Sequence, residues 1–378
     1  MKDAQHERSL MDTNAFLKSC LEKVIEQRGQ DVFLKAGSSP RMRLGGQLLS
    51  LNLKAPSAVE IRELVGGLLD PTQKEILQKN KSVDFGFSFR EKDCRFRANA
   101  FFQQGDISLV FRLLWRGIPS FEELGLPPIL KRVALEKSGI VLIGGTVSSG
   151  KTTTVSAMIR TMNESVQKHI LTIEDPIEYM HEDKKCLIQQ REIGRDAESF
   201  GSALKYMVRQ SPDVIVIGEM RDAESFSFAL SSAEVGRLVI STVHAQSASQ
   251  VFDRVLGFFP PQERDAVLRY FAANMSCIMV QKLLGAKDGK TLVPASEVLL
   301  GNYTIKQLIL EKKIDKIPQA IRNAREEGMQ TMDQSLLELW KAGRISQETA
   351  IAASPSPEDI QSLMKGIQIG QETKILGD

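Results

Sequence analysis

The order of hydrophobic and polar positions changes twice along the chain. In the first third, a helical stripe over 14–26 precedes extended runs at 32–34, 42–44, 83–87 and 95–102, with helical spacing over 61–69 and 73–77. Farther along, buried-strand patterns at 140–143, 170–173, 214–217 and 238–240 alternate with helix-like stretches. Past residue 302 only helical periodicities remain. This order predicts an α+β module, then an α/β domain with a mainly parallel sheet, then a small helical module.

The predicted boundaries follow from these changes of pattern. We place an N-terminal domain over 1–116, a linker over 117–129, the α/β domain over 130–300 and the helical module over 301–378. Three prolines, at positions 119, 127 and 128, mark the linker. A length of 378 residues is compatible with two or three domains.

The overall composition excludes several classes of protein. Hydrophobic residues make up 42% of the chain, charged residues 25%, and the net charge is +2, as in ordinary soluble proteins. No apolar run approaches the length of a membrane helix, and the first residues carry no signal core. The four cysteines are scattered without a CxxC pair, so neither a disulfide framework nor a zinc site is supported. These features predict a cytoplasmic protein.

A phosphate-binding loop is the most specific motif. Residues 145–152 read GTVSSGKT, which fits G-x-x-x-x-G-K-[ST], between an apolar run over 139–144 and a stretch with helical spacing. A loop in this context turns successive backbone N–H groups toward phosphate oxygens, and the helix N-terminus adds its positive dipole end. The predicted nucleotide-binding residues here are Gly145, Thr146, Val147, Ser148, Ser149, Gly150, Lys151, Thr152 and Thr153.

Two residues of this loop have predicted individual roles. Lys151 is expected to bridge the β- and γ-phosphates of ATP, and the Thr152 hydroxyl to hold Mg²⁺. The loop by itself predicts phosphate binding but not hydrolysis.

Polar residues that follow three further strand patterns narrow the chemistry. Glu174 and Glu178 come just after residues 170–173, where a carboxylate can polarise water or hold Mg²⁺. Glu219 ends the run 214–217 and is the candidate general base and a second metal ligand, with Arg221 as a nearby cation. His244 follows the run 238–240 and is a candidate sensor of the γ-phosphate. An acidic turn, a buried strand with a polar end and a structural histidine are the competing explanations.

Together the motifs resemble the type IV pilus retraction ATPases, the PilT/PilU family of secretion-type ATPases, from about residue 31 to 350. The matching segments are the P-loop, TIEDPIEY (172–179), QREIG (190–194), RQSPDVIVIGEMRD (209–222), LVISTVH (238–244) and GMQTMDQSL (328–336). The resemblance implies a PAS-like α+β N-terminal domain, a RecA-like ATPase domain and a small helical C-terminal module. It also implies hydrolysis of ATP with Mg²⁺ to drive pilus retraction and twitching motility.

The resemblance further implies a homohexameric ring in the cytoplasm. Such a ring docks peripherally at the inner membrane on a pilus platform protein. A ring is expected to bring arginines of one subunit or domain to phosphates held by another. The candidates are Arg209, Arg221 and Arg112, although Arg112 fits a solvated strand arginine equally well.

Four positions depart from the family pattern. Val147 and Ser148 stand where threonine and glycine are usual, Lys205 replaces an arginine, and Arg237 replaces a histidine. If position 148 requires a positive φ, Ser148 strains the loop by about 1–3 kcal/mol. These departures support a second hypothesis, a weakly active accessory nucleotide-binding ring that assists a paralogous retraction ATPase.

A third hypothesis, a DNA-translocating ATPase, finds little support. It would require a basic stripe with aromatic residues, whereas the net charge is +2 and aromatic residues make up 6% of the chain. We therefore expect no nucleic-acid partner.

Overall fold

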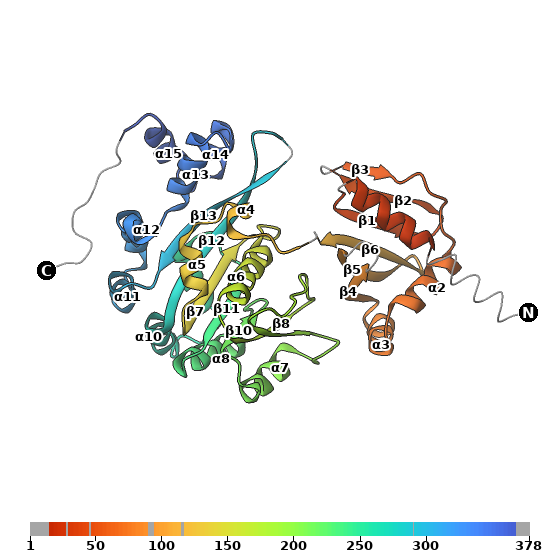
Figure 1. Ribbon diagram of the computed structural model, residues 1–378, viewed down its shortest axis with the longest axis horizontal. Helices are drawn as coiled ribbons and strands as arrows, with labels where there is room; N and C mark the ends of the chain where they lie inside the picture. The colour runs from red at the N-terminus through yellow and green to blue at the C-terminus, as the bar shows by residue number, and fades with distance from the viewer. Residues whose placement is uncertain are drawn as a thin grey trace, which may run out of the picture. The chain divides into compact units, whose positions relative to one another are not determined.

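The computed structural model describes residues 15–27, 29–44, 47–89, 94–114, 117–289 and 291–367. Contacts within the chain group it into two compact units (Figure 1). The first unit comprises Met1–Gly117 together with two later segments, Asp175–Met180 and Glu192–Glu198. The second unit comprises Ile118–Glu174, His181–Arg191 and Ser199–Asp378. Within the described ranges, none of the helices combines the length and hydrophobicity that a bilayer crossing requires.

The first unit is built on one antiparallel sheet with the strand order β3-β2-β1-β6-β5-β4. Its strands are β1 (Asp31–Lys35), β2 (Ser38–Leu44), β3 (Gln47–Ser50), β4 (Ser82–Phe89), β5 (Cys94–Gln103) and β6 (Asp106–Leu114). Its helices cover residues 15–26, α2 (Ala58–Leu68) and α3 (Pro71–Asn80). Alternate residues of β5 are buried, so one face of the sheet forms the core. At its centre the Phe111 ring meets Phe85, Phe87 and Phe96 edge-on.

A buried ion pair holds the two later segments in the first unit. The Arg95 guanidinium donates from Nη2 to Glu192 Oε2 (2.9 Å) and from Nε to the carbonyl of Ile177 (2.6 Å). The backbone N–H of Ile177 donates to the same Glu192 oxygen at 3.1 Å. Because Glu192 is buried, its charge requires these partners. The network therefore fixes segment 175–180, which contains Glu178.

The second unit contains a seven-stranded sheet with the order β13-β12-β7-β11-β10-β8-β9. Its strands are β7 (Gly139–Gly145), β8 (His169–Glu174), β9 (Leu187–Glu192), β10 (Val214–Ile217), β11 (Leu238–Val243), β12 (Met275–Gly285) and β13 (Leu292–Leu300). Strands β12, β7, β11, β10 and β8 run parallel, and β13 pairs antiparallel with β12. Every residue of β7, β10 and β11 is buried, because helices cover both faces of the sheet.

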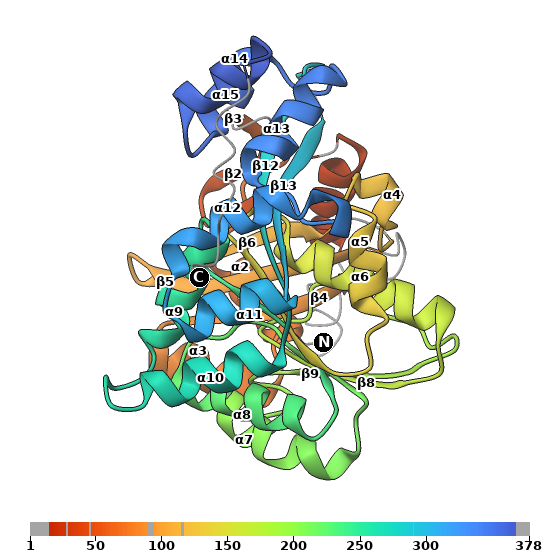
Figure 2. The same cartoon turned by 90° about the vertical axis from the view of Figure 1, so that its left-hand side faces the viewer.

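Helices pack against the strands of this sheet on both faces. The helices around the sheet are α4 (Phe121–Leu124), α5 (Ile129–Ala134), α6 (Lys151–Ser165), α7 (Phe200–Met207), α8 (Ala223–Glu234), α9 (Ala248–Leu256) and α10 (Arg264–Asn274). Helix α6 packs on β7 and β11 from one side, together with α5. Helices α8, α9 and α10 pack on the other side (Figure 2).

A helical module follows the last strand. It contains α11 (Tyr303–Leu310), α12 (Ile317–Asn323), α13 (Met332–Lys341), α14 (Gln347–Ala353) and α15 (Pro357–Met364), with short 3-10 turns η3 (Ile314–Lys316) and η4 (Arg325–Glu327). Gly328 ends η4 at φ 99°, and Thr331 caps α13 through a reciprocal bond with Gln334. Met332 and Leu336 pack into a core with Ala295 of β13. The apolar side chains of α13 therefore pack on the chain's own sheet.

The predicted linker has regular structure. Ser120 and Glu123 form a capping box that starts α4, and Gly125 ends it at φ 68°. Arg160 of α6 donates to the carbonyl of Ile118 and approaches Glu123 (3.6 Å), so this stretch lies on α6. The proline-rich composition marked the change of unit but not the helix between the prolines.

Candidate nucleotide-binding site

The candidate residues of the second unit follow four neighbouring parallel strands. Pairing sets Gly144 of β7 opposite Val243 of β11, and Ser241 of β11 opposite Ile217 of β10. The same register continues from Ile217 to Ile173 of β8. The carboxyl ends of all four strands therefore lie at one edge of the sheet, which is where open α/β sheets bind ligands.

The loop after β7 has the backbone of a phosphate-binding loop. Gly145 adopts φ 152° and Gly150 φ 86°, and α6 begins at Lys151 directly after them. A Cβ at Gly145 would lie 2.7 Å from the carbonyl oxygen of Gln281, so only glycine fits there. Ser148 adopts φ 62°, which is the left-handed conformation that its position was expected to require. Val147 stands at the exposed tip of the loop.

Lys151 is folded back over the loop. Its ammonium donates to the carbonyl oxygens of Gly145 (3.0 Å) and Thr146 (2.8 Å). Both are neutral acceptors, and anionic phosphate oxygens make stronger bonds to an ammonium. The ammonium is thus held against the loop by neutral carbonyl oxygens. Thr152 and Thr153 lie half-buried in the first turn of α6 behind it.

Glu219, Arg221 and His244 form one cluster at the ends of β10 and β11. Glu219 Oε2 accepts from Arg221 Nε (2.8 Å) and Nη2 (2.7 Å), and Glu219 Oε1 lies 3.0 Å from His244 Nε2. Since a carboxylate oxygen accepts, the hydrogen in the second contact sits on Nε2. The Thr242 hydroxyl donates to the carbonyl of Gly218 (2.6 Å) and fixes the backbone just before Glu219.

The first acidic motif is divided between the units. Glu174 ends β8, where its Oε1 accepts from the Thr172 hydroxyl (2.7 Å) and from Gln190 Nε2 (3.1 Å). These two contacts hold the Glu174 carboxyl group at the carboxyl edge of the sheet. Glu178 belongs to the segment held in the first unit.

The other two candidate arginines, Arg209 and Arg112, are not among the residues that the second unit places at this edge of its sheet. Arg209 is exposed in η2 (Val208–Gln210), shortly before β10 begins. The N–H of Asp213 donates to the carbonyl of His169, the first residue of β8, so this stretch lies at the amino edge of the sheet. Arg112 belongs to the first unit, where its Nε donates to Asp31 Oδ1 at 2.8 Å.

The motifs missed one residue that contacts the phosphate loop. Gln281 lies on β12, is buried, and bonds to both Ser149 and Thr154. The available signal was a single amide side chain in the apolar run that begins at Met275. A polar residue inside a buried strand needs a partner, but the sequence does not name that partner.

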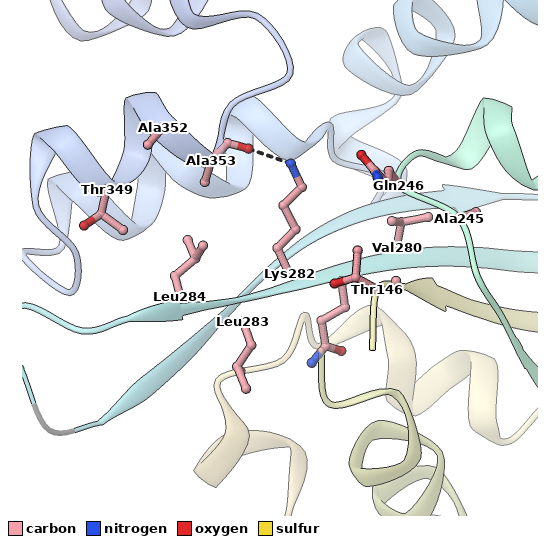
Figure 3. A pocket seen from close by; sticks show the side chains of 12 residues that line it. Thr146, Ala245, Gln246, Val280, Lys282, Leu283, Leu284, Thr349, Ala352 and Ala353 are labelled. Atoms are coloured by element: carbon pink, nitrogen blue, oxygen red, sulfur yellow. Dashed lines mark hydrogen bonds between the residues drawn. The ribbon is translucent and has the colours of Figure 1, made fainter. Parts of the chain in front are cut away.

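A pocket of about 540 Å³ lies beside the first residues of the loop (Figure 3). Gly145 and Thr146 border it on one side and Ala353 of α14 on the other. The Lys282 side chain crosses it, and its ammonium donates to the carbonyl of Ala353 at 2.7 Å. The phosphate loop and the helical module therefore share one cavity.

These features define a RecA-like P-loop fold, and comparison with known proteins places the chain in a family. The family model described as type II/IV secretion system protein matches residues 9–343, and the chain belongs to this family.

Individual relatives have similar sequences over most of their length. The chain is 37% identical over 345 residues to the type IV pilus ATPase PilU of Pseudomonas aeruginosa, covering 91% of this chain and 90% of that protein. It is 37% identical over 334 residues to the retraction ATPase PilT of the same organism, covering 88% and 96%. A crystal structure of the pilus retraction motor PilT with bound ADP superposes with a TM-score of 0.83 at 36% identity, covering 90% and 97%. The predicted family resemblance and fold class are confirmed.

Proposed function

We propose that this chain is a motor ATPase that hydrolyses ATP to drive type IV pilus retraction and so twitching motility. The observation that carries the proposal is the convergence of the Lys151 loop with the Glu219 cluster at neighbouring strand ends. The names of the relatives, PilU and PilT, support it. The motor is proposed to work as a cytoplasmic ring of six identical subunits, docked on an inner-membrane platform protein of the pilus machine.

The loop and α6 bind the phosphates. The N–H groups of the loop and the N-terminal end of α6 provide partial positive charge, and Lys151 adds a full charge. Lys151 exchanges the two carbonyl oxygens that it now contacts for phosphate oxygens. This exchange strengthens as negative charge builds on the transferred group.

The residues present suit Mg²⁺. The Thr152 hydroxyl in the first turn of α6 would hold it, with Glu219 reaching it directly or through water. The described residues contain no cluster of three or more histidine, cysteine and acidic side chains. That arrangement fits an ion that keeps several waters and takes its other oxygens from the substrate phosphates. When bound, the ion neutralises charge on the β- and γ-phosphates.

Glu219 is proposed to take the proton from the attacking water. Arg221 and His244 hold one carboxylate oxygen each, so the group is oriented before substrate arrives. Glu174, held by Thr172 and Gln190, is a second carboxylate at the same edge. Arg209 lies away from this edge in its own chain, which supports its use at the site of a neighbouring subunit.

The substitution Lys151→Ala tests the proposal. It should abolish hydrolysis and weaken ATP binding, because the phosphates lose their cation. Steady-state hydrolysis of the wild-type chain should not respond to single-stranded DNA. A strong stimulation by DNA would favour a nucleic-acid translocase, and unchanged hydrolysis by Lys151→Ala would remove the assigned site.

One observation favours a second function, a weakly active accessory ring beside a paralogous motor. Ser148 holds a left-handed φ of 62° that costs a non-glycine residue about 1–3 kcal/mol. Reverting Val147→Thr and Ser148→Gly together distinguishes the two. A rise in turnover of about tenfold or more would favour the accessory ring. A turnover close to that of the wild type supports the motor.

A further inference from the structure

We propose that Gln281 is a positioning residue of the phosphate loop. It holds the loop in its phosphate-binding conformation and offsets the strain at Ser148. The inference rests on the proposed nucleotide site and adds a residue that lies outside every sequence motif of the chain.

Both ends of the Gln281 amide bond to the loop or to the helix that follows it. Nε2 donates to the carbonyl oxygen of Ser149 at 2.8 Å, and Oε1 accepts from the Thr154 hydroxyl at 2.7 Å. Gln281 is 3% exposed, so water does not compete for either bond. The amide thereby ties a strand of the sheet to the loop and to α6.

The bonded carbonyl belongs to Ser149, the residue between the two left-handed residues of the loop. Ser148 precedes it at φ 62°, and Gly150 follows it at φ 86°. A Cβ at Gly150 would lie 2.8 Å from Gln281 Nε2, so the amide also packs against the second of these residues. Holding the Ser149 carbonyl therefore restrains the short stretch of backbone that links these two residues.

The backbone of Gln281 supports the start of the loop as well. In the pairing of β12 with β7, Gln281 stands opposite Gly145. Its carbonyl oxygen leaves no room for a side chain at Gly145. Gln281 therefore contacts the loop where it leaves β7 and where it enters α6.

This arrangement compensates for a residue that does not favour its own conformation. Serine prefers negative φ, and a loop free to move would turn residue 148 away from the left-handed region. The N–H groups of the loop would then lose their common direction toward phosphate. The bond to the Ser149 carbonyl opposes that rotation, so the loop is ready before nucleotide arrives.

Three variants separate positioning from simple packing. Gln281→Met keeps the size of the side chain and removes both bonds, whereas Thr154→Val removes only the bond to Oε1. Thr161→Val is the matched control, because Thr161 lies on the same helix and its hydroxyl bonds only to the helix carbonyl of Ala157. Titration with a fluorescent ATP analogue and thermal unfolding are measured for each variant.

We expect Gln281→Met to bind the analogue about tenfold more weakly, as for loss of a buried hydrogen bond. Thr154→Val should lose less, and Thr161→Val should bind like the wild type. Binding by Gln281→Met that equals the wild type would overturn the inference. If Gln281→Met does not fold, Gln281→Asn replaces it, because the shorter amide cannot reach both partners; unchanged binding by Gln281→Asn would overturn the inference equally.

The effect of Ser148→Gly on nucleotide affinity distinguishes positioning from packing, because a residue that only fills space would not change that effect. Glycine adopts the left-handed conformation without strain, so the gain in affinity from Ser148→Gly should be at least about threefold larger in the Gln281→Met background than in the wild type. The same fold-change in both backgrounds would overturn the inference. Lys151→Ala distinguishes a failure of the proposed nucleotide site from a failure of the positioning role. If Lys151→Ala binds the analogue like the wild type, both the nucleotide site and the inference fail. If only Lys151→Ala is weakened, the site stands and the positioning role fails.

Discussion

Glu219 and His244 stand at the ends of neighbouring strands, and His244 Nε2 lies 3.0 Å from Glu219 Oε1. This contact brings together two motifs that are separated in the sequence. We therefore propose that His244 orients the candidate base. Arg221 holds the other carboxylate oxygen, so Glu219 is restrained from two sides.

His244→Ala should therefore lower turnover more than nucleotide affinity. Removing a hydrogen bond to a charged group costs about 1.5–3 kcal/mol, so we expect turnover to fall at least about tenfold. The measurement is steady-state hydrolysis alongside nucleotide titration. His244→Gln is the control, since its amide still offers an N–H donor. Equal losses in affinity and turnover would assign His244 to the nucleotide itself.

Arg209 should act in a neighbouring subunit. Its place at the amino edge of its own sheet leaves it far along the strands from its own phosphate loop. Mixing inactive Lys151→Ala chains with inactive Arg209→Ala chains should partly restore hydrolysis, because some junctions then combine an intact loop with an intact arginine. Absence of rescue at every ratio, with mixed rings verified, would contradict action in trans.

Met332→Ala should affect stability and not nucleotide binding. Met332 is buried with Leu336 against β13, so truncation should cost about 2–5 kcal/mol of unfolding free energy. Thermal unfolding and nucleotide titration measure the two effects. Loss of nucleotide binding in folded Met332→Ala protein would place the GMQTMDQSL segment (328–336) in the active site.

The contribution of Glu297 to the stability of the second unit should fall as pH rises toward neutrality. Burial raises the pKa of Glu297 on β13 to about 7. The Asp333 carboxylate also raises this pKa, whereas the hydrogen bond from the Ala248 backbone and the charge of Lys282 lower it. A folded-state pKa above the unfolded value means that the native state binds the proton more tightly. Its stabilisation is complete below about pH 4.5 and is lost as pH rises through about 7.

Glu297→Gln should remove much of this dependence. We expect its thermal midpoint to exceed that of the wild type by roughly 2–4 °C at pH 8 and to match it at pH 5. Glu234→Gln, on the exposed side of α8, is the control and should show no such difference between the two pH values. A midpoint of Glu297→Gln below the wild type at pH 8 would contradict the buried-charge explanation.

The sequence predicted the parts of the fold that have strong local signals. The strand at 214–217 was found because a short apolar run is a local pattern. The hairpin of β12 and β13 was missed, since long apolar runs do not distinguish buried strand from helix and Pro294 argues against a strand. The edge strand β9 is half polar and carries little signal.

In the candidate site, too, local patterns could be recognised in the sequence and long-range contacts could not. Motif residues such as Lys151 and Glu219 could be named as candidates because their predicted chemistry depends on local spacing. The partners of these residues were not, because Gln281 reaches Ser149 from a strand more than a hundred residues later in the chain. Such contacts depend on strand order, which no local pattern contains.

The substitution Glu219→Gln tests the central claim most directly. Glutamine keeps the size and hydrogen bonding of glutamate but cannot take a proton, so ATP hydrolysis should fall at least about a hundredfold while ATP affinity stays close to that of the wild type. Steady-state hydrolysis and nucleotide titration of the two purified proteins give the answer. Turnover of Glu219→Gln at the wild-type rate would contradict the account and transfer the role of base to Glu174 or Glu178.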